Sequence, residues 1–295
     1  MASVLMLVSS HLALASTNIK TNINTTTKTN ANTALKPATS ITAIDRNAPI
    51  KPPAPFQFAL QVTRSASLYD FQDGTRNDSL NYELSPTMQT SIGTFKALAS
   101  YTQNLNDKSQ TASDWNDTAV IYAFPPTSWQ TMDNTIRISY SLTAVIPTSQ
   151  NSIKRDHLQT SLSAKIGFSV SPITDGFSYG MSISAGRNLH AYEEDINGNV
   201  LNQYSSNQNI SLGYTKGDWN LSIDFTNRSR LTYKNNTKSA FEISEEIGYS
   251  LTENMSFSVG HTNAGPTLKA NGTDSNIELY NENTSSVYAG MSWTY

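Results

Sequence analysis

Apolar and polar residues alternate along the chain from Phe56 to its last residue, in segments of about ten residues. Successive side chains of a β-strand point to opposite faces, so this period of two predicts strands with one apolar and one polar face. We count twelve such segments, of which Thr118–Phe124 alternates least clearly: Phe56–Val62, Leu80–Leu84, Thr90–Gln103, Thr118–Phe124, Ile136–Ala144, Leu158–Val170, Phe177–Ala185, Tyr204–Tyr214, Trp219–Phe225, Phe241–Leu251, Met255–Val259 and Val287–Tyr295.

The connections between these segments alternate in length. Short turns are expected at Ser85–Thr87, Ser171–Gly176, Thr215–Asp218 and Thr252–Asn254. Longer polar segments lie between them, at Ser67–Ser79, Asn104–Asn116, Thr148–Asp156, Glu193–Asn202, Thr232–Ser239 and Thr262–Thr284. Pro125–Asn134 is too long for the short turn that this alternation requires at its place.

Short turns at one end and long loops at the other are typical of transmembrane β-barrels, in which the short turns are periplasmic. The sequence therefore predicts an all-β fold over residues 56–295, a closed antiparallel up-and-down barrel of about twelve strands. Both ends of an even-stranded barrel lie on the periplasmic side. A soluble β-sandwich also has alternating strands, but it gives no reason for long strands or for the alternation of loop lengths.

Aromatic residues fall near the ends of several predicted strands, on the apolar face. Rings with a polar group favour the headgroup level of a bilayer, so these residues predict an interfacial girdle. They are Tyr179, Tyr214, Trp219, Tyr249, Trp293 and Tyr295.

The first 55 residues have a different composition. Residues 1–15 combine an apolar run with a small-x-small pattern at Ala13 and Ala15, which predicts a signal peptide, although no lysine or arginine precedes the run. Residues 16–55 are rich in threonine, asparagine and proline and predict a disordered periplasmic leader.

Composition excludes several classes of protein. The mean hydropathy is -0.41, and no stretch of about 18 apolar residues exists, which excludes helical membrane spans. A barrel keeps a polar average because half of each strand faces the lumen. The chain has no cysteine, so disulfides, thiol catalysis and cysteine metal sites are absent. The net charge of -3, without basic clusters, argues against nucleic acid as a partner.

The last strand ends in a pattern with a polar residue, a glycine and two spaced hydrophobic residues: Tyr288, Gly290, Trp293 and Tyr295. This segment resembles the C-terminal β-signal of Gram-negative outer-membrane proteins. The resemblance implies an outer-membrane location, lipid and lipopolysaccharide around the barrel, and the barrel-assembly machinery as a partner that pairs with this edge. Closure then requires Val287–Tyr295 to pair with Phe56–Val62.

Alternation sends a set of charged side chains of both signs inward, and these are the predicted pore-lining residues: Glu83, Lys96, Arg137, Lys165, Asp224, Arg228, Glu242 and Glu246. Two functions remain open. The charges line a narrow channel for passive diffusion of small polar solutes, or they pair across the lumen in a non-conducting structural barrel that acts through its extracellular loops. In the second case Glu242 and Glu246 would face arginine or lysine.

No catalytic or metal-binding constellation is predicted. An outer-membrane lipid hydrolase is the remote alternative, but Ser258 and His261 fall on opposite faces of one strand. Asp195–Asn199 resembles a fragment of a calcium loop without its final glutamate, and Asn197-Gly198 fits a hairpin turn better. We therefore expect no enzyme activity, cofactor or metal. Glu245 falls on the lipid-facing side, which predicts either a β-bulge, the version we favour, or a neighbour that shields it.

Overall fold

A computed structural model describes residues 56–68, 78–105, 113–172, 175–269 and 271–295. The predicted signal peptide and leader, residues 1–15 and 16–55, lie outside these ranges. Within them, no helix is long and apolar enough to cross a membrane. The helical element among the described residues is one short π-helix, η2 (Asn151–Arg155).

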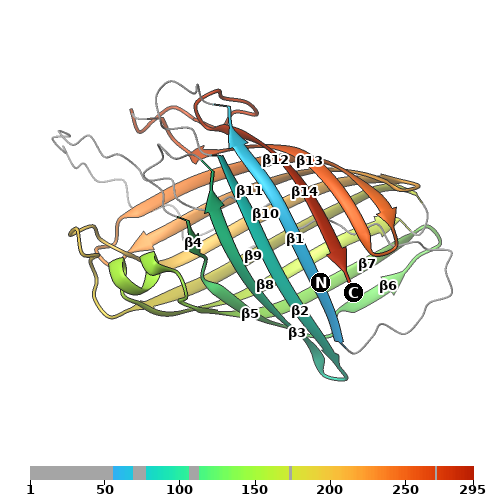
Figure 1. The fold of residues 1–295 in the computed structure, drawn as a ribbon, viewed down its shortest axis with the longest axis horizontal. Coiled ribbons are helices and arrows are strands. Elements are labelled where there is room, and N and C mark those ends of the chain that lie inside the picture. Colours follow the sequence, from blue (N-terminus) through green and yellow to red (C-terminus); the bar gives the residue numbers. More distant parts are fainter. Residues whose placement is uncertain (1–55, 69–77, 106–112, 173–174, 270) are drawn as a thin grey trace, which may run out of the picture. The chain divides into compact units, whose positions relative to one another are not determined.

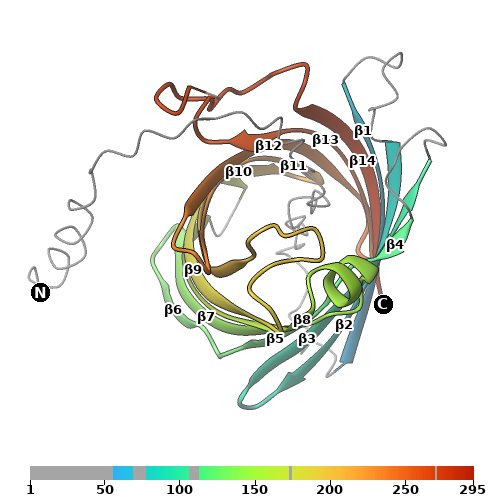
Figure 2. The same ribbon diagram turned by 90° about the vertical axis from the view of Figure 1, so that its left-hand side faces the viewer.

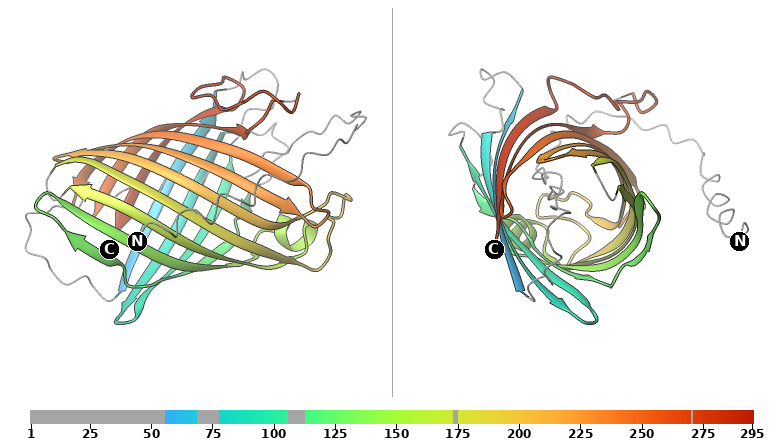
Figure 3. Two further views of the ribbon diagram at one scale, coloured as in Figure 1. Left: turned by 180° about the vertical axis from the view of Figure 1, so that it is seen from behind. Right: turned by 90° about the vertical axis from the view of Figure 1, so that its right-hand side faces the viewer.

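The described residues form one antiparallel sheet that closes on itself (Figures 1 and 2). Apart from β4, β5 and β6, neighbouring strands in the chain pair with each other, and the first pairs with the last. The strands run obliquely around the barrel, as Figure 3 shows from behind. Their bounds are β1 (Phe56–Ser67), β2 (Asp78–Thr90), β3 (Gly93–Asn104), β4 (Asp114–Trp115), β5 (Thr118–Ala123), β6 (Thr127–Gln130), β7 (Asn134–Ile146), β8 (Leu158–Pro172), β9 (Gly176–His190), β10 (Asn202–Lys216), β11 (Trp219–Thr232), β12 (Thr237–Thr252), β13 (Met255–Pro266) and β14 (Ser285–Thr294).

The fourth strand of the barrel is broken into three pieces, which explains its weak alternation. β4 pairs with β3, β5 pairs with both β3 and β7, and β6 pairs with β7. Pro125 and Pro126 separate β5 from β6, where proline offers no N–H to a neighbouring strand. With the three pieces counted as one, the barrel has twelve strands, as the sequence predicts.

Two predicted connections are wrong. The turn after β2 lies at residues 91–92 and not at Ser85–Thr87, because β2 continues through Pro86. Pro86 pairs with Phe58 on β1, and the ladder to β3 lacks partners at Ser85 and Pro86, so the proline interrupts one side of the strand without ending it. The long segment Pro125–Asn134 contains the four-residue strand β6, and its turn is residues 131–133.

The other wrong connection is Thr232–Ser239, which was expected to be a long loop. β11 ends at Thr232 and β12 begins at Thr237, so a tight turn joins them. Asn235 has a positive φ of 59° and closes the turn with a backbone hydrogen bond to Thr232.

The strands have the predicted two faces. Their outward side chains are mostly exposed large hydrophobic residues, for example Ile183, Leu212 and Met291. At the end of the barrel that carries the short turns, which we call the turn end, aromatic rings pair across strands: Phe177 with Tyr214, and Trp219 with Tyr249, each with ring centroids 4.8 Å apart. The opposite end is the loop end. An apolar outer wall with an aromatic border is the surface of a transmembrane barrel.

The bulge that we expected at Glu245 does not exist. The ladder between β11 and β12 is regular from Trp219–Tyr249 to Leu231–Thr237 and pairs Glu245 with Ile223. Glu245 faces outward. His261 lies on the neighbouring strand β13 and shields Glu245, with its Nδ1 3.4 Å from the carboxylate. A register shift does occur further along β12, between Ser250 and Thr252. A cross-strand partner thus takes the role that we had assigned to a bulge.

Candidate functional site: the inward wall of the barrel

The eight predicted pore-lining residues all lie on the inward parity of their strands. Lys165, for example, alternates on β8 with Ala164 and Ile166, which belong to the exposed outer wall. The remaining seven are Glu83 on β2, Lys96 on β3, Arg137 on β7, Asp224 and Arg228 on β11, and Glu242 and Glu246 on β12. Parity gives their direction, while their role in lining a channel stays a prediction.

Side chains on β11 to β14 bind one another across neighbouring strands. Arg228 on β11 donates a hydrogen bond to Glu242 on β12 and forms an ion pair with it. Tyr288 on β14 donates its hydroxyl to Glu246 on β12 over 3.1 Å. The ring of Tyr288 crosses Gly260 on β13, where a Cβ would collide with it. The absence of a side chain at Gly260 therefore allows β14 to reach β12 across the inner wall.

Between the ends of β8 and β9 the inward side chains are small and polar, apart from Lys165. Their positions are Ser161, Ser163, Lys165, Gly167 and Ser169 on β8, and Ser178, Gly180, Ser182, Ser184 and Gly186 on β9. The adjoining strands continue this character with Ser139, Ser141 and Thr143 on β7, and Ser205, Asn207, Asn209, Ser211 and Gly213 on β10. Side chains of this size cannot fill a barrel of twelve strands from this side.

Most of the eight inward charges have no ion-pair partner. Of these eight residues, only Arg228 and Glu242 lie within 4.0 Å of an opposite charge in the described part of the chain. Their partnership joins adjacent strands and does not cross the lumen. Glu246 faces Tyr288 instead of arginine or lysine. Cross-lumen pairing, which the structural-barrel alternative requires, is therefore absent from the described part of the chain.

The inward carboxylates gather on one side of the barrel, together with the inward cation Arg228. Asp224, Glu242 and Glu246 lie on the adjacent strands β11 and β12. β3, which carries Lys96, is six places from β11 around the ring and so lies opposite it. Solutes inside the barrel would meet charges of both signs on β11 and β12, and the cation Lys96 on the opposite wall.

Sequence reasoning missed two inward cations. Arg230 on β11 pairs with Lys238 on β12 in the ladder, and both have the parity of Arg228 and Glu242. Strict alternation continued from Arg228 could have identified both residues. Lys238 was not assigned to a strand, because Thr232–Ser239 was predicted to be a long loop. Together with Arg228 they place positive charge near the loop end.

The loop between β9 and β10 connects to its neighbours at the loop end. In Figure 2 it lies inside the outline of the barrel, near η2. The Ile196 N–H donates to the Arg155 carbonyl over 3.2 Å. Lys234, in the turn after β11, pairs with Glu194, and this hydrogen bond raises the pKa of Lys234 above its ordinary value. These contacts hold the loop against two other connections.

The same loop contains the turn that sequence reasoning assigned to Asn197-Gly198. Gly198 has a φ of 79°, as a tight turn requires. Asp195 accepts hydrogen bonds from the N–H groups of Asn197 and Asn199, each over 2.8 Å. No group of three potential metal ligands is found among the described residues.

The four residues of the predicted assembly signal lie on the seam that closes the barrel. Tyr288 and Gly290 face inward, whereas Trp293 and Tyr295 face outward and are exposed. β14 pairs with β1 from Ala59–Thr294 to Ser67–Ser286, which confirms the predicted closure. Tyr295 exchanges backbone hydrogen bonds with Phe58 over 2.8 and 2.9 Å. Recognition by the assembly machinery stays a prediction.

His261 and Glu245 form the arrangement nearest to a catalytic pair. Glu245 holds Nδ1 of His261, and the ring of Tyr280 stacks on the imidazole with centroids 6.0 Å apart. The other ring nitrogen, Nε2, is buried without a hydrogen-bond partner among the described residues. Because no hydroxyl reaches it there, the pair lacks the nucleophile that a hydrolase of this kind needs.

Comparison with solved structures identifies the fold. The crystal structure of an outer-membrane channel from Pseudomonas putida F1 matches with a TM-score of 0.56 and 8% sequence identity, over 81% of this chain and 95% of that one. The NanC porin matches with a TM-score of 0.46 and 14% identity, over 80% and 98% of the two chains. The KdgM porin has a TM-score of 0.43 and 8% identity, over 80% and 99%. No family model and no curated protein match the sequence.

The outer wall and the shared fold lead to one conclusion. The sheet closes by the pairing of β1 with β14, which is the condition for a β-sheet to cross a bilayer, although the short pieces β4 and β6 each pair on one side only. The exposed apolar wall provides the lipid-facing surface. The described residues form a twelve-stranded transmembrane β-barrel that is similar in fold to the outer-membrane channel from Pseudomonas putida F1.

Proposed function

We propose that the barrel is a narrow channel for passive diffusion of small polar solutes across the outer membrane of a Gram-negative bacterium. The observation that carries this proposal is the inner wall of β7 to β10. Its inward residues are mostly small and polar, and Arg137 and Lys165 lie among them without an ion-pair partner in the described part of the chain. A barrel that is closed by its own side chains needs large groups that interlock across the lumen.

The charges of the two walls give the channel a preference. Solutes that pass the cations Lys96 and Lys165 on one side and the mixed charges of β11 and β12 on the other experience a field across the pore, and small zwitterionic or weakly charged solutes fit this environment best. The proposal invokes no cofactor and no covalent chemistry. The assembly machinery acts before function, at the edge formed by Val287–Tyr295, and lipopolysaccharide surrounds the finished barrel.

The alternative is a non-conducting barrel that acts through its extracellular loops. The contacts of the β9–β10 loop with η2 and Lys234 favour a fixed loop end, which a binding surface would also need. Conduction distinguishes the two functions, because a surface-binding barrel has no requirement for a path through the wall of small residues.

Liposome swelling tests the proposal. The refolded full chain should let vesicles swell in solutions of small sugars, with a rate that falls as the sugar becomes larger. Ser182→Trp places a large ring on the inward wall and should slow swelling severalfold. Ile183→Trp is the matched control, because the neighbouring residue faces outward. No swelling by any folded variant, or equal slowing by both substitutions, would overturn the proposal.

A further inference from the structure

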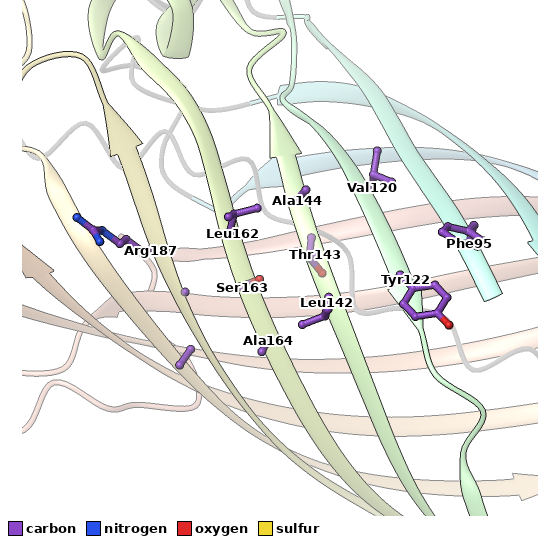
Figure 4. Close-up of a pocket in the computed structure, with 12 residues that line it drawn as sticks. Phe95, Val120, Tyr122, Leu142, Thr143, Ala144, Leu162, Ser163, Ala164 and Arg187 are labelled. Carbon is purple, nitrogen blue, oxygen red and sulfur yellow. The ribbon is translucent and has the colours of Figure 1, made fainter. Parts of the chain in front are cut away.

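A groove of about 630 Å³ lies on the outer wall of the barrel, across β3, β5, β7, β8 and β9. Outward residues that border it include Phe95, Tyr122, Leu142, Ala164, Ala185 and Arg187. Figure 4 shows Arg187 at one end and Phe95 with Tyr122 at the other. Between these ends, Leu142, Ala164 and Ala185 are successive partners in the ladder, and the last two are small. The wall is therefore hollowed where two adjacent strands carry alanine.

The groove is inclined with respect to the strands. Arg187 lies near the end of β9 at His190, which is the loop end, and Phe95 lies near the start of β3 at Gly93, which is the turn end. The groove thus runs from the loop end of the wall toward its turn end. An acyl chain that enters from the outer leaflet lies in this direction.

Arg187 is a cation on the lipid-facing wall without a carboxylate partner among the described residues. Its guanidinium lies 5.6 Å from the ring centroid of Tyr204, its ladder partner on β10. Leu162 is its partner on β8 and borders the groove. A charge at this level favours an anion from the bilayer, because the headgroup region offers phosphate while the hydrocarbon does not.

Arg64 provides a contrast within the same molecule. It also faces outward, on β1, but it forms a bidentate pair with Asp78, with its two nitrogens 3.2 and 2.9 Å from the carboxylate. Its charge is therefore compensated by the protein itself. Arg187 has no such carboxylate, and it alone borders the groove.

We propose that this groove is a binding site for one phosphorylated lipid of the outer leaflet, with an acyl chain along Ala164 and Ala185 and a phosphate on Arg187. Guanidinium groups bind phosphate through paired hydrogen bonds, and Tyr204 holds the side chain from the opposite side. The apolar floor removes the chain from bulk lipid and fixes its place. The site is independent of conduction, since all of these groups are on the outer wall.

Native mass spectrometry of the refolded full chain in detergent tests the site. The probe is bisphosphorylated, hexa-acylated lipid A, titrated against its dephosphorylated form. We expect one retained lipid A, and at least about tenfold weaker retention by Arg187→Gln, because a charge-assisted hydrogen bond is lost. Dephosphorylated lipid A should bind the unaltered chain as weakly. Arg64→Gln is the matched control and should retain lipid A normally.

A second variant tests the groove without touching the cation. Ala164→Phe fills the floor and should weaken retention of lipid A to a similar degree, while folding is checked by the heat-dependent mobility shift of barrels on gels. Equal retention by the unaltered chain, Arg187→Gln and Ala164→Phe would overturn the proposal. Equal binding of the phosphorylated and dephosphorylated lipids would overturn it as well.

Discussion

On β11 to β14 the inward side chains form hydrogen bonds and an ion pair with one another. On β7 to β10 the inward side chains are mostly small and make few such contacts. Glu246 and Tyr288 are each 6% exposed and share a hydrogen bond. Buried polar side chains of the described strands lie on β1, β2 and β11 to β14, with none on β7 to β10. We call these two parts the bonded half, β11 to β14, and the small-residue half, β7 to β10.

We infer that these two parts of the inner wall have different roles. The bonded half joins the strands next to the seam between β14 and β1, where the barrel must close. The small-residue half keeps side chains short and leaves Lys165 uncompensated, which serves a solute path. Substitutions in the bonded half should therefore change stability, and those in the small-residue half should change conduction.

The largest expected effect is on the ion pair of the bonded half. Arg228→Met leaves Glu242 buried without its partner and should lower the free energy of unfolding by about 3 kcal/mol. Urea unfolding of the protein in lipid vesicles, followed by tryptophan fluorescence, measures the change. The double variant Arg228→Met, Glu242→Leu should recover most of the loss. A single variant as stable as the original chain would show that the pair does not support the barrel.

A smaller effect is expected at the glycine that Tyr288 crosses. A Cβ at Gly260 collides with the ring and lies 2.6 Å from the Glu245 carbonyl, so Gly260→Ala should lower the free energy of unfolding by about 1–3 kcal/mol. Gly180→Ala, in the small-residue half, meets only the Ser211 hydroxyl, which can rotate away. Equal losses of unfolding free energy in the two variants would show that the bonded half is not packed more tightly than the small-residue half at these glycines.

The hydroxyl of Tyr288 can be removed without changing the ring. Tyr288→Phe takes a donor from buried Glu246 and should cost about 1–2 kcal/mol in unfolding experiments. Tyr82→Phe serves as the control, because that hydroxyl makes a long, exposed hydrogen bond of 3.4 Å to Gln103. Equal losses of stability in the two variants would show that the hydrogen bond from Tyr288 to Glu246 does not stabilise the barrel.

The smallest effect on stability is expected at Lys165. Lys165→Gln removes a free charge from the small-residue half, so unfolding should be unchanged while the permeability ratio of potassium to chloride rises about twofold. Glu246→Gln should shift the ratio less, in the opposite direction, because its carboxylate is buried against Tyr288. Reversal potentials in a salt gradient give both values, and a larger shift for Glu246→Gln would contradict the division of tasks.

Alternation alone was enough to predict the strands, because each has one side in lipid and the other in a polar interior. All twelve segments became strands, including the seam between Phe56–Val62 and Val287–Tyr295. The ends of elements were harder to predict. Pro86 is a turn residue by type, yet it lies within β2 because a proline can keep the pairing on one side of a strand.

The contacts of the site depend on register, which alternation does not give. The parity of Glu246 and Tyr288 was readable from the sequence, but their hydrogen bond requires two intervening ladders to align them across Gly260. Glu245 shows the same limit: the outward direction was correct, and the partner His261 follows only from the pairing of β12 with β13. Alternation likewise could not predict that Arg187 has no carboxylate partner among the described residues, because this depends on which side chains lie next to it in the fold.

Single-channel recording in a planar bilayer tests the central claim most directly. The refolded full chain, shown to be folded by its mobility on gels, should produce stepwise current increases in potassium chloride, and Ser182→Trp should reduce the step while Ile183→Trp leaves it unchanged. A folded barrel that inserts and gives no current steps would contradict the account and favour a barrel that acts through its loops.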